Sequence, residues 1–155
     1  MAANKNKHGR SAWLLACVMG VGAANAAVYT VGPTGTPGSC THSTIQAAIN
    51  AAAGNPGTDE IRISANQIWP AQALYVENHG VDLIGGFADC ASEMPTAQTE
   101  LSGAGGVSAP VVFVSNTDSH QVRLNRLAIV DGDPAFAMAG SRDGGGIRFL
   151  GPGGL

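Results

Sequence analysis

Gln121–Asp133, with the sequence QVRLNRLAIVDGD, is the stretch that decides the fold predicted for this chain. Val122 and Leu124 alternate with polar residues, as the residues on one face of a β-strand do. The next apolar pair, Leu127 and Ile129, starts three residues after Leu124 instead of two. The stretch therefore predicts two short strands that are out of phase with each other.

The change of phase falls at Asn125 and Arg126. Asparagine is the non-glycine residue that best tolerates a left-handed backbone, so we expect a sharp bend at this point. Both strands can then keep their apolar side chains on one inward face. A chain that repeats this pattern winds into a coil of strands.

The same short apolar alternation recurs along the chain, in segments separated by Gly, Asn, Asp, Ser or Pro. We expect further strands at Val28–Val31, Glu60–Ser64, Ala73–Val76, Val81–Ile84, Thr99–Ser102, Val111–Ser115 and Ile147–Leu150. Five inward positions, if equivalent, recur about every 20 residues, as in a solenoid; they are Ile61, Leu83, Leu101, Leu124 and Ile147. A sandwich of hairpins is the alternative, although no clean two-residue hairpin turn is present.

One helix is predicted, after Ser43. Ser43 is a good N-cap, and Gln46 three residues later completes a capping box. Gly54 and Pro56 end the helix. Its apolar residues fall on one face at helical spacing: Ile45, Ala48, Ile49 and Ala52. This face suits the open end of a β core, and docking to a partner is the alternative.

The first 26 residues have the features of a secretory signal peptide. A basic start that ends at Arg10 is followed by the mostly apolar run Ser11–Ala24 and by the small-x-small site Ala24-Asn25-Ala26. Cleavage there gives a mature chain that begins at Ala27 and has no integral membrane span. Leu14-Leu15-Ala16-Cys17 resembles a lipoprotein box, so lipidation of Cys17 is an alternative fate. We divide the chain into a signal peptide (1–26), an N-terminal strand and capping helix (27–58) and the strand region (59–155).

Removal of the leader makes the chain more acidic. Both lysines lie in the leader, and the mature chain keeps five arginines against all eleven acidic residues, a net charge of −6. Such a charge gives no electrostatic reason to bind nucleic acid. We expect a secreted protein with no nucleic-acid partner.

Two cysteines, Cys40 and Cys90, survive cleavage. An even pair in an exported protein predicts a disulfide. A metal site or a reactive thiol is the alternative, but a metal site needs further ligands nearby. The histidines of the mature chain, at positions 42, 79 and 120, have no zinc-site spacing. We expect no cofactor and no metal site from these residues.

Three motifs resemble the right-handed parallel β-helix proteins of the pectin-lyase-like superfamily. Ser43–Ile49 resembles their N-terminal capping helix, Val122–Ile129 one of their rungs, and Gly144–Ile147 the glycine-led strand of bacterial surface members. The pairing of Cys40 with Cys90 also fits secreted bacterial examples. The resemblance implies an all-β fold, a right-handed parallel β-helix (solenoid) with a short N-terminal capping helix. Such proteins carry more rungs, so we expect this chain to be truncated or to need a C-terminal continuation or partner chain as a cap.

The superfamily includes polysaccharide lyases and hydrolases, so the resemblance implies that carboxylates could act on a sugar. Asp131, Asp133 and Asp143 are candidates for a catalytic pair or for a Ca²⁺ site. Aspartate beside glycine is also ordinary turn composition, which is the interpretation we favour. No catalytic set is predicted.

Other side chains suit the outer surface of a β-helix. Arg123, Arg126 and Arg148 are expected on outer faces as solvated charges. Trp69 and Tyr75 could stack on sugars, although packing within a loop is the commoner role.

The sequence therefore predicts a secreted or cell-surface protein of binding or structural type, similar to an adhesin or a passenger domain, that binds carbohydrate or a host or cell-surface component. The alternative is the N-terminal fragment of a polysaccharide lyase or glycoside hydrolase with active rungs beyond residue 155. An enzyme should gather acidic or basic residues on one outer sheet across adjacent rungs.

Overall fold

A computed structural model of the chain describes residues 25–33, 38–106, 108–133 and 145–151. This part is rich in strands and contains one helix, α1 (Ile45–Ala52). The strands lie close to the predicted positions: β1 (Val28–Val31), β2 (Thr58–Ser64), β3 (Leu74–Glu77), β4 (Gly80–Phe87), β5 (Thr99–Ser102), β6 (Val112–Ser115), β7 (Val122–Asn125), β8 (Leu127–Val130) and β9 (Ile147–Leu150). No helix in these ranges is long and apolar enough to cross a bilayer.

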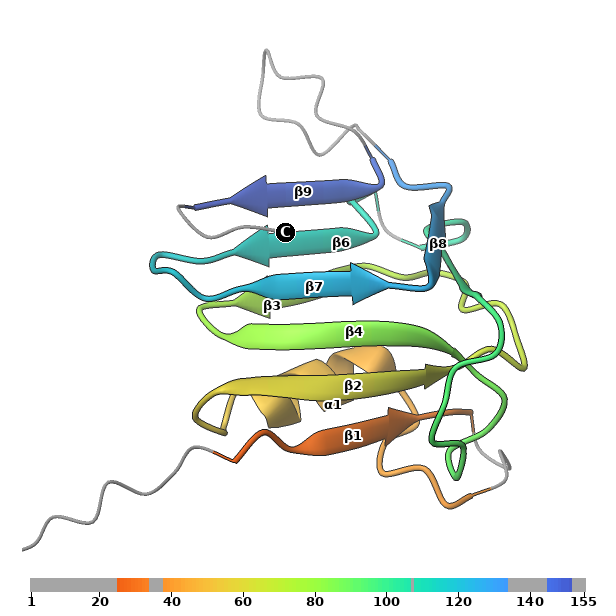
Figure 1. Ribbon diagram of the computed structural model, residues 1–155. Helices are drawn as coiled ribbons and strands as arrows, with labels where there is room; N and C mark the ends of the chain where they lie inside the picture. The colour runs from red at the N-terminus through yellow and green to blue at the C-terminus, as the bar shows by residue number, and fades with distance from the viewer. Residues whose placement is uncertain (1–24, 34–37, 107, 134–144, 152–155) are drawn as a thin grey trace, which may run out of the picture.

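The strands form three parallel sheets (Figure 1). The first sheet has the order β1-β2-β4-β7, the second pairs β5 with β8, and the third has the order β3-β6-β9. From β4 onward the chain visits the first, second and third sheets in turn, and then repeats this order through β7, β8 and β9. Every pairing between the described strands is parallel, which hairpins do not produce. The hairpin alternative is therefore wrong.

The predicted inward positions are only partly equivalent. Ile61, Leu83 and Leu124 are direct neighbours across the first sheet, and Ile61 and Leu83 have no exposed surface. Leu101 lies in the second sheet and Ile147 in the third, where Ile147 is 38% exposed. The prediction that all five are equivalent was wrong for these two, because apolar alternation marks a strand without telling which sheet it joins.

The bend predicted in Gln121–Asp133 is confirmed. β7 and β8 belong to different sheets, and β8 turns away from the direction of β7 (Figure 1). The residue with a left-handed backbone is Arg126, with φ of 52°, and not Asn125, which ends β7. Leu127 and Ile129 of β8 pack on the same core as β7, as the phase change predicted.

Helix α1 covers the end of the core at which β1 lies. It packs against β1, β2 and β3, and the four apolar residues predicted for its inner face are all buried. Its N-cap is Thr44 instead of Ser43, because the Thr44 hydroxyl accepts from the backbone N–H of Ala47 at 3.3 Å. Gln46 consequently takes no part in a capping box.

The predicted disulfide is confirmed. Cys40 and Cys90 are bonded, with their Cα atoms 5.1 Å apart. The bond joins the segment before α1 to the turn that follows β4. It therefore ties the helix at one end of the core to the middle of the first sheet.

Each sheet has one edge that is covered by non-strand residues. His42 forms a parallel bridge to Val31 on the free side of β1, and Trp69 forms one to Leu101 on the free side of β5. Gln46 covers the free side of β3 through its side chain. On the opposite side, β7, β8 and β9 are the outermost strands and pair with no further strand in the described part of the chain. Open edges of this kind favour the addition of another strand.

Candidate functional site

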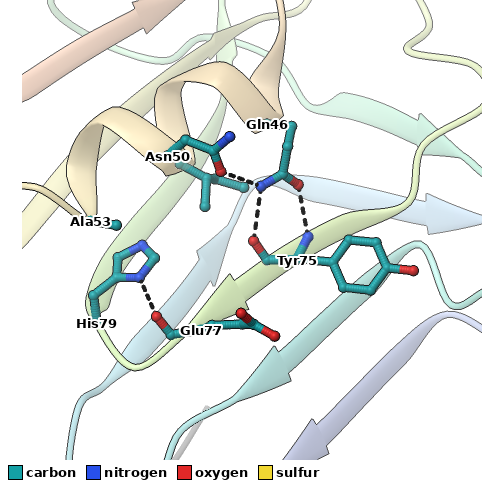
Figure 2. A pocket seen from close by; sticks show the side chains of 7 residues that line it. Gln46, Asn50, Ala53, Tyr75, Glu77 and His79 are labelled. Carbon is teal, nitrogen blue, oxygen red and sulfur yellow. Dashed lines mark hydrogen bonds between the residues drawn. The ribbon is translucent and has the colours of Figure 1, made fainter.

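A pocket of about 200 Å³ lies between α1 and β3. Helix α1 supplies one wall of the pocket. Strand β3 and His79, which follows it, supply the other wall (Figure 2). Most of the side chains in its wall are polar or aromatic, and the lining residues are Gln46, Ile49, Asn50, Ala53, Tyr75, Glu77 and His79. We call this the α1–β3 pocket.

Gln46 joins the two walls of the pocket. Its Oε1 accepts from the backbone N–H of Tyr75 at 2.8 Å, and its Nε2 donates to the Tyr75 carbonyl at 3.0 Å (Figure 2). The same Nε2 donates to Oδ1 of Asn50 at 2.9 Å. A side-chain amide has one acceptor and two donors in a fixed plane, so Gln46 substitutes for a neighbouring strand at the edge of β3.

Gln46→Ala is expected to lower the free energy of unfolding by about 1–2 kcal/mol, because both backbone bonds to Tyr75 are lost. Alanine is the best helix former, so a loss cannot come from helix propensity. Denaturant unfolding measures the effect, with Asn50→Ala as the matched control because it leaves both bonds to Tyr75 in place. Equal stability of the two variants would contradict the role given to Gln46.

His79 lines the pocket and bonds to the strand beside it. It is only 7% exposed, and its Nδ1 lies 2.9 Å from the carbonyl oxygen of Glu77. Because a carbonyl can only accept, Nδ1 is the donor in this bond. Nε2 is buried without a hydrogen-bond partner among the described residues and lies on the side of α1 (Figure 2).

An aromatic row runs across the outer face of the third sheet beside the pocket. Tyr75, Phe113 and Arg148 are neighbours in register on β3, β6 and β9. The Tyr75 and Phe113 rings have centroids 5.7 Å apart, and the Arg148 guanidinium carbon lies 5.8 Å from the Phe113 centroid. Tyr75 is 39% exposed. The row presents ring surface to solvent next to the polar groups of the pocket.

A charged row lies on the outer face of the first sheet. Glu60, Asp82 and Arg123 are neighbours in register, and Arg62 lies on the same face of β2. Arg62 pairs with Glu60, and Arg123 pairs with Asp82 at 3.3 Å. Both carboxylates are therefore already engaged by an arginine from this sheet.

Asp131 and Asp133 lie in the irregular segment that follows β8. Asp131 follows β8 with φ of 53°, and its Oδ2 accepts from the Ser102 hydroxyl at 2.9 Å. The backbone N–H of Asp133 donates to the Ala109 carbonyl at 3.2 Å. Asp143 lies outside the described residues, so the calcium set stays a prediction. Within the described ranges, no three His, Cys, Asp or Glu side chains are grouped to hold a metal ion.

The aromatic residues predicted as sugar contacts have different positions. Trp69 is 5% exposed, and its Nε1 donates to the Ser64 carbonyl at 3.0 Å, so it belongs to the core. Tyr75 lies in the aromatic row. Arg126 is also exposed, and its Nη1 donates to the Ala97 carbonyl at 3.4 Å. Cys17 lies outside the described residues, so its lipidation stays a prediction.

The sequence did not indicate the α1–β3 pocket. The alternation in 112–114 is enough to turn Phe113 outward, but it does not identify β3 as the neighbour of β6. The sequence pattern predicts a capping box for Gln46, and for His79 it raises only the question of a zinc site. These residues meet through contacts between segments that are distant in sequence.

Comparisons of the chain with models of protein families, with curated proteins and with solved structures found no match. Its function therefore has to be inferred from the residues described above.

Proposed function

We propose that this chain is the N-terminal part of a secreted or cell-surface protein of the right-handed parallel β-helix class, and that it acts by binding. The fold proposal is supported by three parallel sheets that the chain visits in a repeated order, with α1 at one end. The resemblance to pectin-lyase-like proteins is part of the same proposal. A circular dichroism spectrum dominated by helix would contradict it.

The proposal of secretion is supported by the leader pattern and by the Cys40–Cys90 bond. Disulfides persist in oxidising compartments and are rare in the cytosol, so the bond is compatible with an extracellular location. Mass spectrometry of protein recovered after export tests the leader directly. Retention of residues 1–26, or a lipid on Cys17, would contradict the proposed processing.

The open side of the three sheets supports a further part of the proposal, in which a C-terminal continuation or a partner chain adds parallel strands beyond β7, β8 and β9. Ile147 and Leu150 of β9 are 38% and 43% exposed, which an added strand could reduce. Hydrogen exchange tests it. Slow exchange of β9 amides in an isolated monomer would contradict the need for a cap.

Binding of carbohydrate is the function that the pocket and the aromatic row support best. The observation that carries it is the exposed Tyr75 ring, which lies between the polar α1–β3 pocket and Phe113. Sugars offer apolar C–H faces that pack on aromatic rings and hydroxyl groups that bond to amide, carboxylate and imidazole groups. The exposed Glu77 carboxylate supplies acceptors for such hydroxyls.

Titration calorimetry with cellohexaose and xylohexaose tests this function. Neutral oligosaccharides are the appropriate probes because the mature chain is acidic, and oligogalacturonate serves as the anionic comparison. We expect Tyr75→Ala to weaken binding of the neutral probes about tenfold. Met94→Ala is the control, because Met94 is 75% exposed and is not among the residues that line the pocket. Unchanged affinity in Tyr75→Ala, or no binding of either neutral probe, would contradict the proposal.

A polysaccharide-cleaving enzyme is the second candidate, favoured by the charged row. Glu60 and Asp82 are acidic neighbours on adjacent strands, as an enzyme of this class requires. The ion pairs to Arg62 and Arg123 count against free catalytic carboxylates. New reducing ends or unsaturated sugars in the calorimeter samples, abolished by Asp82→Asn, would favour the enzyme over the binding protein.

A further inference from the structure

We infer that removal of residues 1–26 creates an ion pair between the new α-amino group of Ala27 and the buried carboxylate of Asp59. The inference rests on the proposed secretion and adds a function to the cleavage itself. The processed N-terminus becomes a structural element that closes the start of the first sheet.

Ala27 already lies against Asp59 in the full chain. Its backbone nitrogen donates to Oδ1 of Asp59 at 2.6 Å. Its carbonyl accepts from the backbone N–H of Glu60 at 2.9 Å, and the next residue, Val28, begins β1. The ladder between β1 and β2 therefore holds the Ala27 nitrogen in this position.

Asp59 is incompletely satisfied in this arrangement. It is 1% exposed, and its Oδ2 is buried with no hydrogen-bond partner among the described residues. None of the ion pairs in the described part of the chain includes Asp59. A buried carboxylate is costly unless it is paired with a cation and its lone pairs are bonded.

Cleavage supplies Asp59 with the two things that it lacks, a cation and a hydrogen-bond donor for Oδ2. A leader peptidase hydrolyses the Ala26–Ala27 bond: the carbonyl carbon of Ala26 takes the water oxygen and becomes a carboxylate. The Ala27 nitrogen takes the protons and becomes an ammonium group at neutral pH. The single N–H of the precursor thus becomes a charged group with three donors, which can bond to both oxygens of Asp59.

The bond to be cut is accessible on the leader side. Asn25 and Ala26 are exposed, whereas Ala27 is half-buried. A cut at any other position would leave an ammonium group that the ladder does not hold beside Asp59.

The chain provides a clean probe for this ion pair. Both lysines, Lys5 and Lys7, lie in the leader, so the Ala27 α-amino group is the sole primary amine of residues 27–155, the segment to be tested. An amine reagent such as trinitrobenzenesulfonate therefore reports on this group alone. We expect exported, folded protein to react about tenfold or more slowly than its Asp59→Asn variant, because the ion pair holds the amine protonated and covered.

Asp82→Asn is the matched control, since Asp82 is a carboxylate on the outer face of the same sheet, and it should react as slowly as the unmodified protein. In denaturant all three proteins should react at one rate. Equal rates for folded wild-type protein and Asp59→Asn would overturn the inference.

A second measurement covers the case in which Asp59→Asn fails to fold. The cleaved chain 27–155 should unfold at a higher denaturant concentration than the uncleaved chain 1–155 with the same Cys40–Cys90 bond. Equal midpoints would overturn the inference. A first residue other than Ala27 would overturn it together with the proposed leader, whereas a correct Ala27 terminus with a fully reactive amine would overturn the inference alone.

Discussion

Replacing both Cys40 and Cys90 with alanine is expected to lower the free energy of unfolding by about 4 kcal/mol. The disulfide closes a loop with a sequence separation of 50 residues, which includes α1, β2, β3 and β4. Without the bond, the unfolded chain regains the conformational freedom of this whole loop. Folding then has to overcome a larger loss of entropy. Denaturant unfolding followed by circular dichroism measures the change.

Reduction provides the control for the alanine substitutions. A reductant should lower the stability of the wild-type protein to that of the double variant and leave the double variant unchanged. If the variant were as stable as the oxidised protein, the bond would contribute nothing to the fold. The result also bears on where the protein works. A fold whose stability depends on a disulfide suits an oxidising compartment.

Leu83→Ala is expected to cost about 2–5 kcal/mol, because it leaves a cavity in the centre of the core. Leu83 has no exposed surface and lies in β4 between Ile61 of β2 and Leu124 of β7. The surrounding backbone is held by ladders on both sides of β4, so it cannot easily close the cavity. Chemical denaturation of the purified variant measures the loss.

Ile68→Ala is the matched control for Leu83→Ala. Ile68 is 57% exposed, and its truncation should change the stability by less than about 0.5 kcal/mol. A similar loss in both variants would mean that Leu83 is not part of a tightly packed core. Together the two variants test whether the inward face of the first sheet forms a tightly packed part of the hydrophobic core.

The strands were predictable because each depends on a signal within a few residues. Alternation of apolar and polar residues located β7 and β8, and their phase difference located the bend between them. The prediction of the left-handed residue was wrong by one position: Arg126 takes this backbone, although asparagine tolerates it better. Asn125 is still paired with Ile84 of β4. The pairing of β7 with β4 therefore decides that the bend begins one residue later.

The candidate site was much less predictable. Cys40 and Cys90 could be paired because they are the two cysteines that follow the leader. Tyr75 was noted as an aromatic residue, but its neighbour Phe113 comes from a strand that follows much later in the chain. Gln46 was expected to bond within its own helix and bonds to β3 instead.

The sequence by itself determined where the strands and α1 lie, the inward face of Gln121–Asp133, the pairing of the cysteines and a predicted mature start at Ala27. These features depend on periodicity, composition or short motifs. Only the tertiary structure decided which strands share a sheet, that Gln46 covers the edge of β3, and that Asp59 lies beside the Ala27 nitrogen. The physical reason is that parallel pairing joins distant segments through backbone hydrogen bonds, which every residue except proline can form on both sides. Local sequence therefore does not encode which partner a strand takes.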